Sequence, residues 1–174
     1  MCYNIRMLNV DGKTIVAGVL MVGALLLPLG GAAGEAYFGF AGALTLPQGG
    51  SQLRHLGGVA LRGGYYLNDD WAVEGEAAWL ENAAGLSVQA LGHFQGWSLY
   101  GDLFGYSRFD PFVTLGAKGW IGQDDGQVGP KAGLGAFYHL TDDWSIRVDA
   151  DATLGLETDC EIIYSLSAGV QYSF

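Results

Sequence analysis

The stretch that decides the fold is Tyr164-Ser165-Leu166-Ser167-Ala168-Gly169-Val170-Gln171-Tyr172-Ser173-Phe174. Every even-numbered position in it is apolar or aromatic, and every odd-numbered position is small or polar. A period of two is the pattern of a β-strand with one apolar face. The stretch is also long enough to cross a membrane, which takes about 9–11 tilted residues. We therefore predict a strand whose apolar face contacts lipid.

The composition favours one domain of tightly curved antiparallel β-structure. The 174 residues include 29 Gly and only 4 Pro, together with 5 Trp, 9 Tyr and 8 Phe. The formal net charge is −10 and the chain has only 8 Lys and Arg, whereas a nucleic-acid partner requires a basic face. We expect no nucleic-acid partner. We also expect no cofactor or metal, because removal of Cys2 with a signal peptide leaves one Cys and three His at unrelated spacings, which give no ligand framework.

Residues 1–33 are typical of a cleaved signal peptide. Arg6 and Lys13 precede the apolar stretch 14–29, and small residues follow at 30–34. The apolar stretch is short for a membrane helix, and the small residues suit signal peptidase. We expect residues 34–174 to form the mature barrel domain; a retained helical anchor is the alternative.

A strand–turn–strand unit occurs twice, at residues 65–77 and 138–150. Both copies contain Asp-Asp-Trp, at 69–71 and 142–144. Acidic turn residues bond the local backbone, and Trp suits a membrane–water interface because its ring is apolar and its N–H is polar. Trp71 and Trp144, with Tyr172, are therefore predicted to be interface aromatics.

Eight strands are expected in the mature chain, forming an all-β, antiparallel up-and-down transmembrane barrel. Their ranges are 36–46, 53–67, 71–81, 87–104, 112–121, 131–140, 144–155 and 162–174. An even number of strands brings both termini to one side, which is the periplasmic side in an outer membrane. The periplasmic turns are then expected at 68–70, 107–111 and 141–143, and short outer loops near 47–52, 82–86, 122–130 and 156–161.

The charges at strand positions all lie opposite the apolar face. Four are basic and four acidic: Arg62, Lys118, Lys131 and Arg147, with Glu74, Glu76, Asp149 and Asp151. In a membrane barrel this face lines the interior, whereas in a soluble lipocalin-like barrel it faces water. Equal numbers of opposite charges favour the interior, since buried charges must be paired. Because side chains can fill an eight-stranded barrel, we predict a plug made of ion pairs.

The chain resembles the small eight-stranded outer-membrane barrel family typified by the transmembrane domain of OmpA and by OmpX. Three segments carry the resemblance: Leu67-Asn68-Asp69-Asp70-Trp71-Ala72-Val73-Glu74, Phe109-Asp110-Pro111-Phe112-Val113-Thr114-Leu115-Gly116-Ala117, and Val170-Gln171-Tyr172-Ser173-Phe174. It implies a Gram-negative outer-membrane protein, exported through the periplasm and surrounded by lipid and lipopolysaccharide. It further implies a monomer that the barrel-assembly machinery inserts, with Tyr172 and Phe174 as the C-terminal signal.

For function, the expectation is a non-catalytic barrel with a structural or surface-interaction role. One alternative is a narrow porin-like channel or small-molecule carrier. Another is a lipid A-modifying enzyme, for which a His-x-Ser pairing near the outer end would be required. The nearest match, His139-Leu140-Thr141, adjoins a predicted periplasmic turn. Cys160, in a predicted outer loop, could link two copies through a disulfide.

Overall fold

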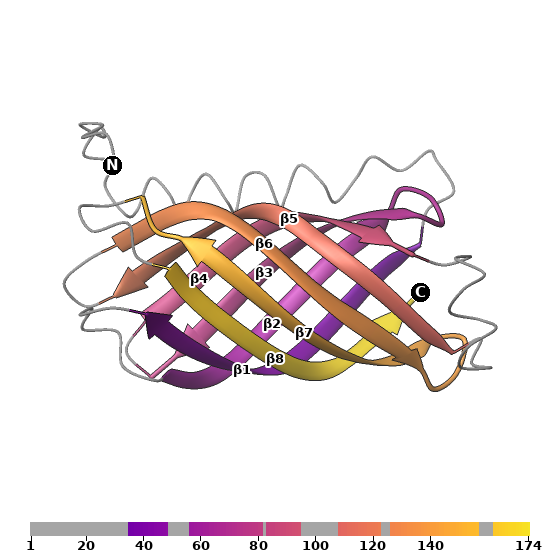
Figure 1. The fold of residues 1–174 in the computed structure, drawn as a ribbon. Coiled ribbons are helices and arrows are strands. Elements are labelled where there is room, and N and C mark those ends of the chain that lie inside the picture. Colours follow the sequence, from indigo (N-terminus) through magenta and orange to yellow (C-terminus); the bar gives the residue numbers. More distant parts are fainter. Residues whose placement is uncertain (1–34, 49–55, 82, 95–107, 123–125, 157–161) are drawn as a thin grey trace.

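The computed structural model describes residues 35–48, 56–81, 83–94, 108–122, 126–156 and 162–174. They form eight antiparallel strands that pair in sequence order and close into a barrel (Figure 1). The strands are β1 (Ala36–Gln48), β2 (Leu56–Tyr66), β3 (Trp71–Leu80), β4 (Ala83–His93), β5 (Phe109–Gly122), β6 (Gly126–His139), β7 (Trp144–Leu154) and β8 (Ile162–Ser173). Helices long and apolar enough to cross a membrane are absent from these residues. The predicted signal peptide and Cys160 lie outside the described residues.

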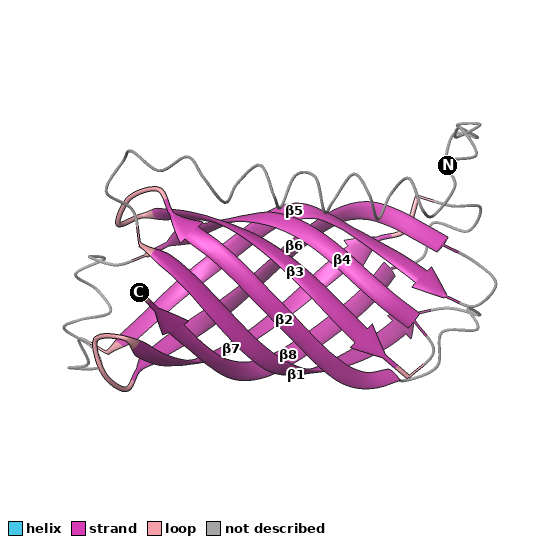
Figure 2. Cartoon of the chain, turned by 180° about the vertical axis from the view of Figure 1, so that it is seen from behind, coloured by secondary structure: helices cyan, strands magenta, loops and turns pink. Residues whose placement is uncertain are grey.

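The barrel closes where the last strand meets the first. β8 pairs with β1 from Tyr37 opposite Ser173 to Gln48 opposite Ile162. The strands cross the barrel obliquely, as the view from behind also shows (Figure 2). The predicted eight-stranded antiparallel barrel is therefore confirmed.

The two faces of each strand differ as the sequence period requires. In β8, Ser165 and Gln171 are buried inside the barrel, while Leu166 and Val170 are exposed on its outer surface. In β3, Glu74 and Glu76 are buried between the exposed Trp71 and Trp79. Since successive side chains of a strand point to opposite faces, polar groups line the lumen and apolar groups cover the outside.

The barrel has two distinct ends. The turns at 67–70 and 140–143 lie at the end that also holds Glu35 and Phe174, where the N–H of Phe174 donates to the carbonyl of Ala36. We call this the terminal end. The opposite end, where β1, β3, β5 and β7 finish, we call the loop end.

The expected boundaries of the fourth strand are wrong. β4 runs from Ala83 to His93, not from 87 to 104, and it pairs with β3 up to the Leu80–Ala83 pair. Residues 83–86 of the expected outer loop therefore belong to β4. Ala83, Gly85 and Ser87 continue the inward-facing period, but small residues give only a weak hydrophobic signal. Residues 95–104 lie outside the described residues.

β5 and β6 also begin earlier than expected. β5 starts at Phe109 and β6 at Gly126, so residues assigned to a turn at 107–111 and a loop at 122–130 are partly in strands. Asp110 is one of these, and it faces the lumen with 2% of its surface exposed. Asp and Pro favour turns in sequence patterns, but a buried partner can hold an Asp inside a strand.

Aromatic rings inside the barrel cover glycines on the neighbouring strand. Tyr37 lies directly opposite Gly64, and a Cβ added to Gly64 would overlap the Tyr37 ring. Trp120 covers Gly85 in the same way. The aromatic side chain fills the space that the glycine leaves and shields its backbone.

Candidate functional site

The candidate site is the charged interior of the barrel. The eight charged residues come from β2, β3, β5, β6 and β7, and all point into the lumen because they share the inward period of their strands. Their side chains are at most 7% exposed. Ion pairs connect all eight into one set, which we call the ion-pair network.

The arginine half of the ion-pair network has short contacts. Arg62 donates from Nε to Glu76 Oε2 over 2.7 Å and from Nη1 to Asp149 Oδ1 over 2.8 Å. Arg147 donates from Nε to the same Asp149 oxygen over 2.8 Å and from Nη1 to Glu74 Oε2 over 2.5 Å. Asp149 thus joins the two guanidinium groups, and charge-assisted bonds of this length are strong.

The lysine half is looser. Lys118 Nζ is 3.2 Å from Glu76 Oε1 and 3.9 Å from Asp151 Oδ1. Lys131 Nζ is 3.3 Å from Asp151 Oδ2 and 3.9 Å from Glu76 Oε1. Glu76 belongs to both halves, so the network is continuous across the lumen.

Neutral polar groups complete the shell of the network. Tyr37 donates from its hydroxyl to Glu74 over 2.9 Å, and Gln89 donates from Nε2 to the other Glu74 oxygen. Ser167 donates to Asp149 over 2.9 Å. Sequence reasoning missed these three residues, although each occupies an inward position of its strand; only the cross-strand register shows which charge it meets.

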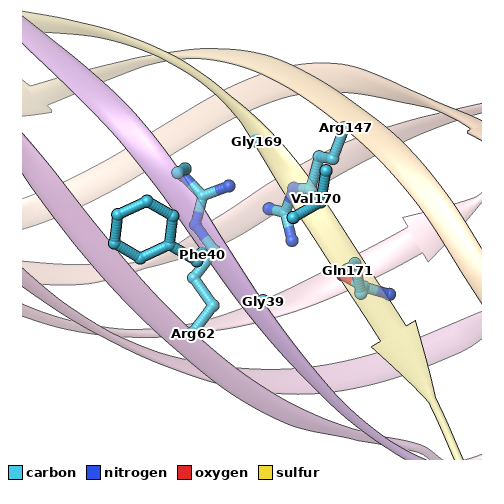
Figure 3. A pocket seen from close by; sticks show the side chains of 8 residues that line it. Gly39, Phe40, Arg62, Arg147, Gly169, Val170 and Gln171 are labelled. Carbon is cyan, nitrogen blue, oxygen red and sulfur yellow. The ribbon is translucent and has the colours of Figure 1, made fainter.

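Both arginines border a small pocket in the wall. It lies at the seam between β1 and β8, where Gly39 and Gly169 carry no side chains, and Gln171 also lines it (Figure 3). Arg147 Nη2 is without a hydrogen-bond partner among the described residues. Its guanidinium instead lies over the Phe112 ring, 4.7 Å from the ring centroid, and favourable cation–π attraction operates at this distance.

Two histidine contacts lie at the terminal end. His93 Nδ1 is 2.7 Å from Asp110 Oδ2, and both side chains are buried. His139 Nδ1 is 2.8 Å from the Ser145 hydroxyl. A histidine–serine contact therefore exists, but at the end opposite the one where a His-x-Ser pairing of the deacylase type was required. The described residues contain no group of three His, Cys, Asp or Glu side chains that could hold a metal ion.

The predicted interface aromatics lie on the outer surface at the terminal end. Trp71 and Trp144 are 50% and 47% exposed. The Tyr172 ring is 5.1 Å from that of Trp144 and also 5.1 Å from that of Phe174, measured between ring centroids. Trp144, Tyr172 and Phe174 thus form one patch where β7 and β8 meet, whereas Trp71 lies on β3.

Residues 17–174 match the family model of the outer membrane protein beta-barrel domain. A comparison with curated proteins finds no match. Among solved structures, the N-terminal β-barrel domain of OprF from Pseudomonas aeruginosa is 20% identical with a TM-score of 0.55, covering 81% of this chain and 99% of that chain. OprG from the same organism is 13% identical with a TM-score of 0.57, covering 82% of this chain and 96% of that chain.

Ail, the attachment invasion locus protein of Yersinia pestis, was solved with the heparin analogue sucrose octasulfate. It is 17% identical with a TM-score of 0.55, covering 81% of this chain and 97% of that chain. At these identities the similarity establishes a shared fold. With the family match, the closed eight-stranded barrel and the apolar outer face, the chain belongs to the outer membrane protein β-barrel domain family and is a protein of the bacterial outer membrane.

Proposed function

We propose that this protein is a closed, non-catalytic barrel with a structural or surface-interaction role in the outer membrane. The observation that carries the proposal is the pairing of all eight charges of the ion-pair network with one another. A conducting pore needs charges that can interact with passing ions, whereas charges paired this closely are already neutralised by protein groups. The ion-pair network is thus a filling that holds the opposite walls together.

Charge distribution limits the surface-interaction role. Four of the chain's 8 Lys and Arg are inside the lumen, and the net charge of the whole chain is −10. An acidic surface repels polyanions, so a heparin-like ligand such as the one bound to Ail does not suit this chain. A cationic or uncharged surface partner fits better, and contact with lipopolysaccharide phosphates would require divalent cations.

The test is to reconstitute the mature protein and measure both alternatives together. Planar-bilayer conductance is expected to stay at the baseline of protein-free membranes, with a known porin as the positive control. Lipid A incubated with the protein is expected to keep its mass spectrum. A steady ionic current would support the narrow-channel alternative, and a mass change that Ser145→Ala abolishes would support the enzyme alternative; either would overturn the proposal.

We further propose that Trp71, Trp144 and Tyr172 anchor the barrel at the periplasmic interface, and that Tyr172 and Phe174 form the signal read by the barrel-assembly machinery. Phe174 is 75% exposed, so its ring is accessible to such a partner. Removal of Phe174 is expected to reduce assembly in cells while leaving refolding in detergent intact. If removal of Phe174 reduces refolding in detergent as much as assembly in cells, Phe174 acts in folding alone.

A further inference from the structure

A layer of rings crosses the lumen at the terminal end. We call it the ring septum; its members are Tyr37, Tyr66, His93, Phe112, Phe137 and His139. The contacts between them are continuous, with centroid distances of 5.0 Å for Tyr37–Tyr66, 5.4 Å for Tyr66–His93, 5.7 Å for His93–Phe137, 4.7 Å for Phe112–Phe137 and 6.3 Å for Phe137–His139. The chain of contacts reaches from β1 to β6.

The remaining strands close the layer. Gln171 of β8 donates to the Tyr66 hydroxyl over 3.2 Å, and Ser145 of β7 contacts His139. Ala72 of β3 is fully buried in the same apolar cluster. Every strand therefore contributes a side chain to this level of the lumen, and six of these side chains carry rings.

Besides His139 Nδ1, three polar atoms of the ring septum have protein partners. The Tyr37 hydroxyl bonds Glu74, the Tyr66 hydroxyl bonds Gln171, and His93 Nδ1 bonds Asp110. His93 Nε2 is buried without a partner among the described residues. Water or an ion that enters this layer thus meets mainly aromatic carbon, and the transfer of a charge into such surroundings is costly.

The level of the ion-pair network differs from the ring septum because it contains several buried hydroxyls without protein partners among the described residues. Thr45, Ser165 and Thr153 are buried there, and their hydroxyls have no hydrogen-bond partner within the described part of the chain. Thr45 lies opposite Ser165, which lies opposite Asp151. Buried hydroxyls of this kind are usually satisfied by water, and the 3.9 Å contacts of the lysines leave similar scope for it. Among the described residues, the network level therefore offers three such hydroxyls to water, whereas the rings of the septum offer one unpartnered buried atom, His93 Nε2.

We propose that the ring septum, rather than the ion-pair network, is the permeability barrier of this barrel. The inference rests on the closed state proposed above and adds which side chains maintain it. Arg147 couples the two layers, because its guanidinium lies over Phe112 and Phe137 while its Nη1 bonds Glu74. The network positions Arg147 over the rings, and the rings exclude ions.

A second apolar cluster, at the loop end, is the other layer that could act as the permeability barrier. It contains Ala60, Ala78, Leu80, Ala83, Trp120 and Ile163. Its one ring, Trp120, lies against Gly85 on the adjacent strand, so it covers the wall of the lumen. Half of the cluster is alanine, and it has a single ring where the ring septum has six. We therefore assign the barrier to the ring septum alone.

The experiment compares four proteins in planar bilayers: wild type, Phe112→Ala/Phe137→Ala, Lys131→Ala/Asp151→Ala and Trp120→Ala. The second double variant shortens two lumen side chains and keeps the formal charge unchanged. Stepwise currents are expected from the Phe112→Ala/Phe137→Ala variant, and baseline recordings from the other three. Heat-modifiable gel mobility of each sample confirms that it has folded; Tyr66→Ala replaces the double ring variant if that variant does not fold.

The outcomes separate the two proposals. Current through the wild type overturns the closed state and hence the proposed function. A closed wild type with current through Lys131→Ala/Asp151→Ala or Trp120→Ala overturns only the assignment of the barrier. If the folded Phe112→Ala/Phe137→Ala variant carries no current, that assignment is overturned as well.

Discussion

At the scale of single residues, the lumen has no spare volume where rings lie over glycines. A Cβ on Gly64 would overlap the Tyr37 ring, whereas a Cβ on Gly57 would meet nothing within 4 Å. Gly64→Ala is therefore expected to lower the free energy of unfolding by about 1–3 kcal/mol, the usual cost of overpacking. The measurement is urea unfolding in detergent micelles.

Gly57→Ala is the matched control, because it changes the same residue type on the same strand. We expect it to stay within about 0.5 kcal/mol of wild type, as surface substitutions usually do. Equal losses for the two variants would show that backbone flexibility, rather than the Tyr37 contact, explains the glycine at 64.

Arg147 is the residue on which the charged interior depends most. It bonds Glu74, which is fully buried, and Asp149. Arg147→Ala leaves Glu74 without its cation, and breaking a buried pair in this way costs about 3–5 kcal/mol. The exposed Arg108 is the control, and Arg108→Ala is expected to change the unfolding free energy by less than about 0.5 kcal/mol.

The same unfolding titration measures both arginine variants. A loss below about 1 kcal/mol for Arg147→Ala would mean that Glu74 finds other partners, and the role of the network as a structural filling would have to be abandoned.

At the scale of elements, the two copies of the Asp-Asp-Trp hairpin close in related ways. Asn68 Oδ1 accepts hydrogen bonds from the N–H groups of Asp70 and Trp71, over 3.0 and 2.9 Å. Thr141 Oγ1 accepts one, from the N–H of Trp144 over 3.0 Å. The side chain before the acidic pair thus caps the turn in each copy.

Asn68→Ala is expected to destabilise the barrel more than Thr141→Ala, because it removes two of these bonds instead of one. At about 1 kcal/mol per net hydrogen bond, the losses are about 2 and about 1 kcal/mol. Asn68→Asp keeps the acceptor oxygen and serves as the control. If Asn68→Asp lost as much as Asn68→Ala, the capping bonds would not account for the effect.

At the scale of the whole molecule, the apolar outer surface is short along the barrel axis. Trp71 and Trp79, both exposed, mark its two edges on β3. A rise of about 3.3 Å per residue and a tilt of roughly 35–45° place these edges about 20 Å apart along the axis, and the longer exposed apolar run of β7, from Trp144 to Leu154, spans about 25 Å. The barrel therefore matches a thin bilayer.

We expect the urea-unfolded chain to insert faster and more completely into vesicles of short-chain phosphatidylcholines than into those with long acyl chains, because a longer hydrocarbon region creates hydrophobic mismatch. Tryptophan fluorescence follows insertion, and heat-modifiable mobility reports the folded fraction. If insertion does not depend on the length of the lipid acyl chains, the apolar surface extends beyond Trp71 and Trp79.

The sequence alone determined the architecture, since the period of two is a local property of strand geometry. It assigned Arg62, Glu76 and Arg147 to the face opposite the apolar one, and those residues line the lumen. It failed where local signals conflict with tertiary context. Asp110 has the composition of a turn residue, yet a histidine on the adjacent strand holds it inside β5.

Only the tertiary structure decided which lumen residues meet. Arg62 and Asp149 are 87 positions apart, and their contact depends on the register of every strand between them and on the closure of β8 against β1. The ring septum is also a product of closure, because its rings come from different strands. Alternation is set within a strand, but the partners of a side chain across a barrel are set by the stagger of all eight strands together.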